Sequence, residues 1–441
     1  MNPGGFLEPA SSTEVRSPVK LTLPDRGPFQ FPAPYGTVGI RLTNASDMHG
    51  ADALWYCGYS YWPNVNCHTG QSDLLVFLGI DRQRGGDGPS LWRVDKATDQ
   101  VTPLGPIFDQ SAALSWATGE GWYWSATEWN ILYASDQTHL YRVDVSPRLA
   151  GQQPLVTPVV TMTEPGRILW QWHTSNSGAV HSATVKDAES YLALGSVVYV
   201  EGESAPYPYP AKGGYDECQI DKGGEFLLTK DNIDGQSGED NVIYTVGSAK
   251  EPRILYDEEG AAGHSDNGFA YMVAADNWNS KPSAFRLWQF DPTMDPQGRL
   301  VYYTSTWDAE LNHVSHCNAQ SGRPDRQYVL GSSANRVPGP RNNEIIGFRL
   351  DGSCEVLVVA PVLTDLNASG GGSDDYAKLP KGNVDVTGTY FLWTANNGSD
   401  RLDAFLVKVP AQLLVPPAPP PANVWTVIDP SGSTRRFQEV P

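Results

Sequence analysis

Short stretches in which apolar and polar residues alternate recur along this chain. The most regular stretches carry an aromatic residue and end near Asp or Gly, as in residues 91–95 and 140–144. Alternation with a period of two predicts β-strands, and a unit that recurs along a chain predicts a repeat architecture. The copies of this strand lie at residues 91–95, 140–144, 197–200, 243–247, 287–291, 346–350 and 405–409. We therefore expect seven similar structural units.

A second unit precedes most of these strands. Residues 218–227 align without gaps with residues 382–391, and residues 183–192 follow the same outline. Each reads as an inner strand, a tight turn at Asp or Gly, and an apolar strand, which is how a propeller blade begins. Each predicted inner strand is marked by one residue on or beside it. These residues are His68, Trp116, His181, Glu217, His264, His316 and Asn383.

The repeats predict an all-β fold, a seven-bladed β-propeller that forms a single domain over residues 36–412. The strand-like segment 37–42 is expected to complete the last blade, so that no sheet edge is left exposed. Residues 1–35 are expected to be an irregular N-terminal extension, and residues 413–441 a Pro-rich tail with a small hairpin at 424–438. The competing fold is a β-sandwich followed by another all-β domain, which offers no reason for seven similar units.

Composition and charge narrow the partners. With 14 Trp, 20 Tyr, 43 Gly and 35 Pro, the chain suits short aromatic strands broken by turns. Its 31 basic and 50 acidic residues give a net charge of −19, which argues against nucleic acid and against long polyanions. No apolar run is long enough to span a membrane. We expect a secreted or periplasmic protein whose leader is absent from this chain.

The five cysteines cannot all pair with one another. Cys57 and Cys67 are close enough in sequence for a local disulfide, so we expect that bond. Cys218, Cys317 and Cys354 read as buried thiols, with Cys317 also a candidate ligand.

Histidines are the main functional signal, because His68, His181, His264, His313 and His316 fall at blade starts, where we expect them to face the axis. Neutral imidazoles of His264, His313 and His316 would suit a divalent metal (Mn, Zn or Ca), with Glu217, Asp266 or water completing the shell. The odd spacing of His313 and His316 places them on opposite faces of a strand unless a bulge intervenes. The alternative is that these histidines only form hydrogen bonds within the channel.

Other residues are candidates for proton transfer and for sugar binding. His181 and His68 could serve as general acid or base, and Tyr215 as a phenolic acid or base. Trp116 and Trp172 have flat faces that could stack on sugar rings, with Glu217 binding hydroxyls. The alternative is that these side chains form internal hydrogen bonds or pack between sheets.

The seven-unit pattern, together with His264 and the His313 and His316 pair, resembles the propeller-fold polysaccharide lyases. These include oligogalacturonate lyases and ulvan and rhamnose–glucuronate lyases. The resemblance covers residues 36 to 412 and implies β-elimination at a uronate, with a metal at the three histidines. Under that reading His181 or His68 is the base and Tyr215 an acid or base. The substrate would be a short oligosaccharide rather than a long polymer.

Two other functions stay open. A non-catalytic propeller could bind glycans or protein partners through its aromatic residues and Pro-rich tail. A propeller glycoside hydrolase could use Glu217 and Asp266 as its two carboxylates. The chain lacks a nucleotide-binding glycine motif, a nucleophile elbow and a Cys-x-x-Cys zinc pattern.

Overall fold

The computed structural model describes most of the chain, and in a few segments it describes the backbone only. The described residues are 4–47, 54–56, 62–80, 82, 85–116, 119–236, 239–247, 252–256, 265–276, 284–290, 298–303, 313–317, 324–353, 355–415, 424–428 and 434–438. Backbone alone is described for 54–56, 115–116, 119, 254–256, 276, 313–317, 424–428 and 434–438.

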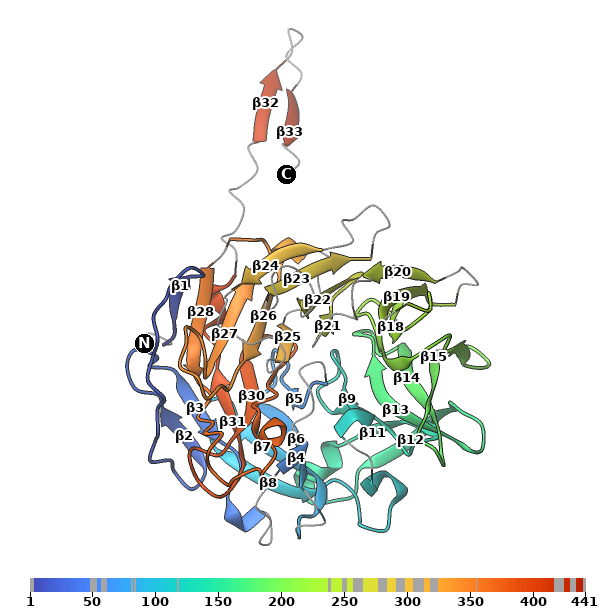
Figure 1. Ribbon diagram of the computed structural model, residues 1–441, viewed down its shortest axis with the longest axis horizontal. Coiled ribbons are helices and arrows are strands. Elements are labelled where there is room, and N and C mark those ends of the chain that lie inside the picture. Colours follow the sequence, from blue (N-terminus) through green and yellow to red (C-terminus); the bar gives the residue numbers. More distant parts are fainter. Residues whose placement is uncertain are drawn as a thin grey trace.

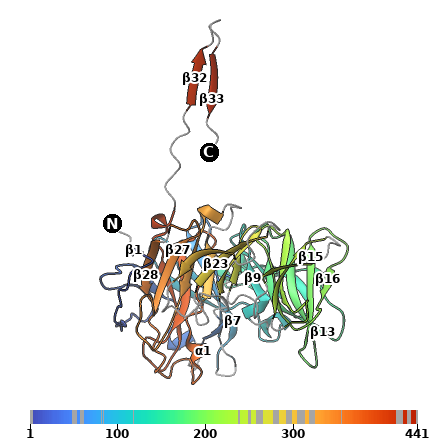
Figure 2. The same cartoon turned by 45° about the horizontal axis from the view of Figure 1, so that its top comes forward.

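Seven antiparallel sheets surround one axis and form a seven-bladed β-propeller (Figure 1). Figure 2 shows the ring tilted, with the blades side by side around it. The strands of the first three blades are given in order from the axis outward. Blade 1 holds β4 (Leu54–Tyr56) and β5 (Val65–Asn66), then β6 (Asp73–Ile80), β7 (Gly88–Asp95) and β8 (Val101–Pro106). Blade 2 holds β9 (Trp122–Trp124), β10 (Ile131–Ser135), β11 (His139–Asp144) and β12 (Leu155–Thr161). Blade 3 holds β13 (Arg167–Thr174), β14 (Val180–Asp187), β15 (Ala193–Val200) and β16 (Tyr207–Pro210).

The other four blades follow the same order. Blade 4 holds β17 (Tyr215–Ile220), β18 (Phe226–Asp231), β19 (Asp240–Thr245) and β20 (Arg253–Tyr256). Blade 5 holds β21 (Ser265–Asn267), β22 (Tyr271–Asp276), β23 (Ala284–Gln289) and β24 (Arg299–Tyr303). Blade 6 holds β25 (His313–Cys317), β26 (Tyr328–Ser332), β27 (Glu344–Arg349), β28 (Glu355–Pro361) and β1 (Phe6–Pro9). Blade 7 holds β29 (Asn383–Val384), β30 (Tyr390–Ala395), β31 (Asp403–Lys408), β3 (Val38–Arg41) and β2 (Gly27–Gln30).

Helical segments in the described residues are short. One is a single α-helical turn, α1 (Asp375–Lys378), and the others are 3₁₀ turns. The 3₁₀ turns are η1 (Ala45–Asp47), η3 (Ala113–Trp116), η4 (Gly119–Gly121), η5 (Ser146–Ala150), η6 (Pro324–Arg326) and η7 (Ala411–Leu413). In the tail, β32 (Val424–Ile428) and β33 (Thr434–Gln438) pair with each other, which confirms the predicted hairpin.

All seven copies of the aromatic strand are the third strand of a blade: β7, β11, β15, β19, β23, β27 and β31. The prediction of equivalent positions is therefore confirmed. The inner-strand assignments are mixed. Glu217, His316 and Asn383 lie on inner strands, and His68 directly follows one. The assignment of Trp116 is wrong because it ends η3 ahead of β9, and His264 lies outside the described residues.

His181 also fails as an inner-strand marker, because it lies on β14, the second strand of blade 3. The match of residues 183–192 to the start of a blade is wrong for the same reason. That segment covers the end of β14, the turn at Asp187 and the residues that lead to β15. Asp turns occur in more than one loop of a blade, so the sequence pattern does not say which loop it marks.

The other two copies of the second unit are equivalent in detail. Asp221 Oδ1 accepts hydrogen bonds from the backbone N–H groups of Glu225 and Phe226, at 2.7 and 2.9 Å. Asp385 Oδ1 accepts from the aligned residues Thr389 and Tyr390, at 2.9 and 2.6 Å. A carboxylate that accepts two backbone donors fixes the turn between the inner strand and the second strand.

The ring closes through strands from the start of the chain. β3 pairs with β31, which confirms that the segment 37–42 completes the last blade. Residues 1–35, expected to lie outside the ring, contribute β1 to blade 6 and β2 to blade 7. Partly buried ionic contacts hold this segment: Arg341 Nη1 lies 2.7 Å from Glu8, and Arg16 Nη1 lies 3.1 Å from Glu344. Because these partners are far apart in sequence, they tie the N-terminal segment to blade 6.

The expected bond between Cys57 and Cys67 is not formed. Cys67 is a buried free thiol, whereas Cys57 lies outside the described residues. Burial raises the pKa of the Cys67 thiol to about 11, and the nearby Asp385 carboxylate adds to that effect. Cys67 therefore behaves as a small core residue, packed with the apolar side chains between blades 7 and 1.

The equivalent turns lead to a stability prediction. Asp385→Ala should lower the free energy of unfolding by about 2 kcal/mol, because it leaves buried backbone donors without a partner. Asp187→Ala, at an exposed turn with similar backbone bonds, should cost less, since water can replace the carboxylate. Urea unfolding followed by fluorescence compares the two variants. Equal losses would contradict the role given to the buried turn.

Candidate functional site

Polar side chains from blades 2 to 5 meet at the axis of the ring. They lie on or beside the inner strands β9, β13, β17 and β21, of which β9 and β21 are seen beside the centre in Figure 1. Those that make the contacts described below are Tyr123, His173, Glu217, Lys222 and Asp266, each buried or nearly so.

A bulge in β13 sets the position of His173. The pairing of β13 with β14 shifts register between Trp170 and His173, and Gln171 has a φ of 52° in the left-handed region. Trp172 consequently packs in the blade core, where its Nε1 donates to Thr174 Oγ1 at 3.0 Å. His173 lies near the axis, and burial lowers its pKa to about 3 despite the nearby Glu217 carboxylate. The imidazole is therefore uncharged at neutral pH.

Trp62 supports this histidine from across the ring. Its indole ring lies 5.1 Å from the His173 ring, and its Nε1 donates to the backbone oxygen of Trp172 at 2.5 Å. Trp62 precedes the inner strand of blade 1, and His173 lies on blade 3. Their contact therefore joins two blades that are not neighbours in the ring. The His173 ring is thus held between Trp62 and Tyr123, whose ring centroid is 6.0 Å away.

Lys222 joins three blades at the axis. It follows β17 in the Asp221 turn, and its Nζ donates to Tyr123 Oη of blade 2 at 3.0 Å. The same ammonium lies 3.4 Å from Asp266 Oδ1 of blade 5. Burial acts to lower the pKa of Lys222, but the charge of Asp266 outweighs it and the net shift is upward. Lys222 is therefore a buried, fixed cation.

Glu217 belongs to a second pair on blade 4. A bulge in β17 between Tyr215 and Cys218 shifts the pairing with β18 beside Glu217. Glu217 Oε1 lies 2.8 Å from Lys230 Nζ and accepts a hydrogen bond from Gln219 Nε2 at 3.3 Å. The Gln219 amide also donates to Ser265 Oγ of blade 5 at 3.2 Å. Gln219 thus links the Glu217 carboxylate of blade 4 to Ser265 of blade 5.

Carboxyl groups gather near Glu217. Burial, with Glu217 adding to it, raises the pKa of Glu120 on η4 to about 7, while a hydrogen bond with Trp170 opposes the shift. Burial and the Glu217 charge also raise the pKa of Asp216, and burial and Asp216 raise that of Glu239. A carboxyl group that titrates near neutrality can exchange protons at physiological pH.

The structure separates several of the proposed residues from the axis. His181 is fully buried inside the blade, with its ring 5.0 Å from Tyr133 and its Nδ1 3.1 Å from Thr174 Oγ1. The expectation that it faces the axis is therefore wrong. Tyr215 packs between blades 3 and 4 near Cys218, and burial raises its pKa well above the usual value. Trp172 is only 1% exposed, so its face is already covered.

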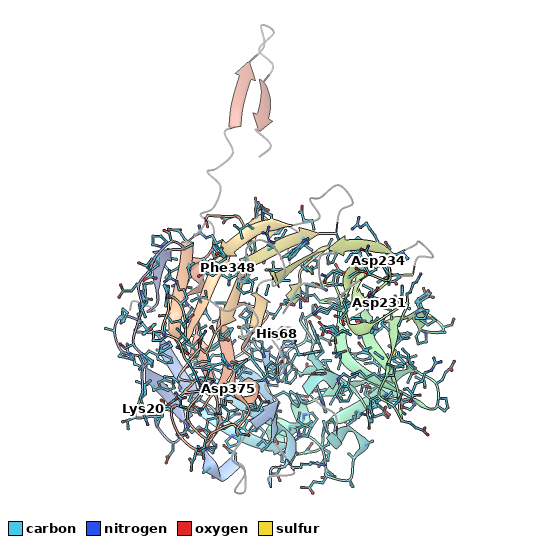
Figure 3. The ribbon with its side chains drawn as sticks, in the orientation of Figure 1. Lys20, His68, Asp231, Asp234, Phe348 and Asp375 are labelled. Carbon is cyan, nitrogen blue, oxygen red and sulfur yellow. The ribbon has the colours of Figure 1, made fainter. Side chains whose placement is uncertain are left out.

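His68 does lie near the centre of the ring (Figure 3). Its Nε2 is 2.7 Å from Asn66 Oδ1 and 3.3 Å from the backbone oxygen of Ser125. Burial lowers the pKa of its ring. Trp116 is described by its backbone alone, as the last residue of η3.

The predicted metal ligands are only partly described. His264 lies outside the described residues, and His313 and His316 are described by the backbone of β25 alone. The pairing of β25 with β26 is continuous from 313 to 317, so no bulge in that strand brings positions 313 and 316 to one face. Among the residues whose side chains are described, no three His, Cys, Asp or Glu groups form a metal-binding cluster.

His173, Tyr123 and Lys222 were not proposed from sequence. His173 directly follows Trp172 at the end of an alternating segment, so the sequence did point to this strand. Strict alternation along the strand does not show which of the two residues faces the axis, because the bulge in β13 is not visible in the sequence. Nothing in the sequence pairs Lys222 with Tyr123, because 99 residues separate them.

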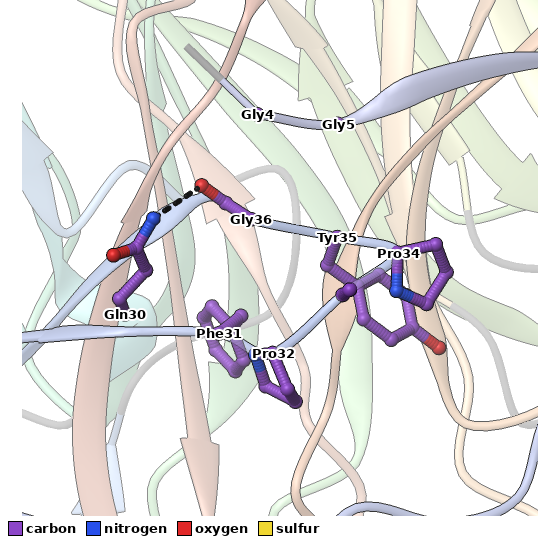
Figure 4. A pocket seen from close by; sticks show the side chains of 9 residues that line it. Gly4, Gly5, Gln30, Phe31, Pro32, Pro34, Tyr35 and Gly36 are labelled. Carbon is purple, nitrogen blue, oxygen red and sulfur yellow. Dashed lines mark hydrogen bonds between the residues drawn. The ribbon is translucent and has the colours of Figure 1, made fainter. Parts of the chain in front are cut away.

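A pocket at the edge of the ring does not match this chemistry. It has a volume of about 560 Å³ and lies between Gly4–Gly5 and the segment 30–36 (Figure 4). Gln30 is the polar side chain there that forms a hydrogen bond shown in the close-up, donating to Gly36 O at 3.3 Å. No ionisable group other than the Tyr35 phenol lines this pocket.

Comparisons with known proteins support the fold. No protein-family model matches the chain, and no curated protein matches it in sequence. Among solved structures, an oligogalacturonate lyase in complex with manganese aligns with a TM-score of 0.58 and 13% identity, covering 93% of this chain and 99% of that one. An oligogalacturonate lyase from Vibrio parahaemolyticus aligns with a TM-score of 0.58 and 10% identity, covering 90% and 100%. The similarity shows a shared propeller fold. No helix in the described residues is long and apolar enough to cross a membrane.

The buried imidazole yields a pH prediction. His173 should stay neutral at pH 5, where a free histidine is protonated, and its ring NMR signals should not change between pH 7 and 5. Because its pKa is lower in the folded state than in the unfolded chain, its contribution to stability is complete above about pH 6.5 and falls as the pH drops toward 3. A titration of the His173 ring with a midpoint near pH 6.5 would contradict the burial argument.

Proposed function

We propose that this protein is a carbohydrate-active lyase that cleaves uronate-containing oligosaccharides by β-elimination at the propeller axis. The observation that carries the proposal is the fixed ammonium of Lys222, which contacts the Tyr123 phenol and lies beside the uncharged His173 ring. The full-length likeness to two oligogalacturonate lyases supports the same reaction class. We further propose that the protein acts outside the cytoplasm, where such glycans occur.

Each group has a role in this reaction. An ammonium has three N–H donors, and in Lys222 two are directed to Tyr123 and Asp266, so the third can bind the substrate carboxylate. Pairing that carboxylate with a cation makes the C5 proton more acidic. The negative charge of the bound substrate carboxylate raises the pKa of the His173 ring from its depressed value, so that the ring can accept this proton. The C4–O bond breaks as the C4=C5 double bond forms, and the Tyr123 phenol protonates the leaving oxygen. Solvent then returns both side chains to their starting protonation states.

The net charge of −19 argues against binding an anionic substrate, but two lysines near the axis offset this charge locally. Lys222 and Lys230 are buried beside the axis, where charges interact more strongly than at the surface. A single uronate can therefore be bound at the axis of an acidic protein.

We also propose that His264, His313 and His316 supply ligands for a divalent metal, since one of the two lyases was solved with manganese. None of the steps above depends on it. Elemental analysis should find about one divalent ion per chain, and His264→Ala should lose most of it. A metal-free wild-type protein would overturn the metal proposal and leave the lyase proposal to its own test.

The lyase proposal predicts an ultraviolet absorbance from the new double bond when the protein meets uronate oligosaccharides. Lys222→Met and Tyr123→Phe should each lower kcat/KM by about 100-fold, because each removes a group that binds or protonates the reacting sugar. Tyr133→Phe is the matched control, since Tyr133 pairs directly with Tyr123 across β9 and β10. Equal effects of the two tyrosine variants, or no unsaturated product from any uronate substrate, would contradict the proposal.

A glycoside hydrolase is the second candidate, and Glu120 favours it. A carboxyl group with a pKa of about 7 near the Glu217 carboxyl offers the acid and nucleophile pair that glycosidases use. Asp266 suits the hydrolase less well, because it already contacts Lys222. Release of reducing ends without ultraviolet absorbance, lost in Glu120→Gln, would select the hydrolase.

A further inference from the structure

The C-terminal hairpin has no partner sheet within the described part of the chain. β32 and β33 pair with each other and with no described strand of the seven blades, and they stand clear of the ring in both views (Figure 1, Figure 2). An isolated two-stranded hairpin is marginally stable in water, because a stable sheet needs three or more strands with an apolar face. The hairpin therefore calls for further strands from another source.

The outermost strands of the ring are protected against pairing with another chain. Proline, which cannot donate a ladder hydrogen bond, lies in five of the seven, namely β8, β12, β16, β1 and β2. The other two, β20 and β24, each begin with an arginine. β33 is protected by charge, because it contains Arg435 and Arg436. β32 lacks such protection, since its sequence Val-Trp-Thr-Val-Ile contains neither charge nor proline and consists of strong strand formers.

We propose that β32 pairs antiparallel with β32 of a second copy of this chain, about a two-fold axis at Thr426. The product is one sheet of four strands, with the two β32 strands in the middle and the two charged β33 strands at the edges. This register places Trp425 opposite Val427 of the partner subunit, and Val424 opposite Ile428 of the partner subunit. Each apolar residue thus meets an apolar residue, and the contact is the same from both sides, as a two-fold interface requires. The inference is independent of the proposed activity.

The register of the hairpin gives the four-stranded sheet an apolar face. Trp425 pairs with Phe437 and Val427 with Arg435, and alternate residues of a strand lie on the same face, so Trp425, Val427 and Phe437 share one face. Cross-strand partners also share a face, so the same three positions of the second copy join them. Six apolar residues then lie on one face, where a single hairpin has three. This meets the requirement that an isolated hairpin does not meet.

Charge favours the tail of a second copy over its ring as the partner. Residues 413–441 contain two acidic and two basic residues, so their net charge is zero and the whole charge of −19 belongs to residues 1–412. Two acidic rings repel each other, and this repulsion falls with distance. Eight residues, five of them proline, separate Val415 from β32, and a proline-rich spacer holds apart the elements that it joins. A contact between tails therefore joins two copies while it keeps their rings apart.

Sedimentation velocity of the full chain at low salt tests this pairing. The wild type should form a dimer whose fraction rises with protein concentration. Thr426→Lys places two like charges opposite each other at the axis, so it should raise the dissociation constant of the dimer at least about tenfold. Thr434→Lys is the control, because position 434 lies on the same face as position 426 but on the other strand. It should leave the dissociation constant within about twofold of the wild-type value.

Charge complementation separates a loss of pairing from a loss of the hairpin itself. Thr426→Glu should also be monomeric alone, whereas an equimolar mixture with Thr426→Lys should form a dimer, because opposite charges then meet at the axis. A wild type that is monomeric at every concentration overturns the proposal, and so does a Thr426→Lys protein that dimerises like the wild type. A mixture that stays monomeric rejects the pairing about Thr426. Growth beyond a dimer also overturns the proposal, since a two-fold contact closes on itself.

Discussion

Closure of the ring is the constraint on which the rest of this structure depends. Each blade has two largely apolar faces, and both are covered only if every blade has a neighbour on each side. β3 completes this arrangement by pairing with β31, and β1 extends blade 6. The apolar clusters between blades, such as the one shared by β27, β28, β30 and β31, form because the ring is complete.

Closure of the ring also brings ionisable side chains from different blades together at the axis. Seven inner strands converge there, and their side chains approach one another from different blades with little space between them. A lysine that follows the inner strand of blade 4 can therefore reach a tyrosine of blade 2 and an aspartate of blade 5. Since these groups are buried, each charge needs a partner, and the partners fix their positions. The bulges in β13 and β17 then decide which residues of those strands take part.

The parts of the fold that follow regular alternation could be predicted from sequence. In six of the seven blades the third strand pairs with the second strand without a register shift, so its alternating aromatic pattern marked the blade. The inner strands are short or bulged, and counting by twos fails across a bulge. The bulge in β13 places Trp172 in the blade core and leaves His173 at the axis, which the sequence does not reveal. His181 was misassigned for another reason, because it lies on the second strand β14. The Asp turn misled for a different reason, because an aspartate also accepts backbone hydrogen bonds at Asp187, in a different loop of the blade from Asp385.

Contacts between residues far apart in sequence limit how much of the site can be predicted from sequence. Glu217 and Asp266 were proposed from their blade starts, and both lie where expected, but their partners Lys230 and Lys222 decide what they can do. Each carboxylate is held by a lysine, so neither is free in the way a sequence reading assumes. The charges also act at different ranges. The overall negative charge repels an anion at a distance, while a buried ammonium attracts it only within a few ångströms. A buried lysine held by Asp266 and Tyr123 is therefore the local feature that offsets the overall charge at the axis.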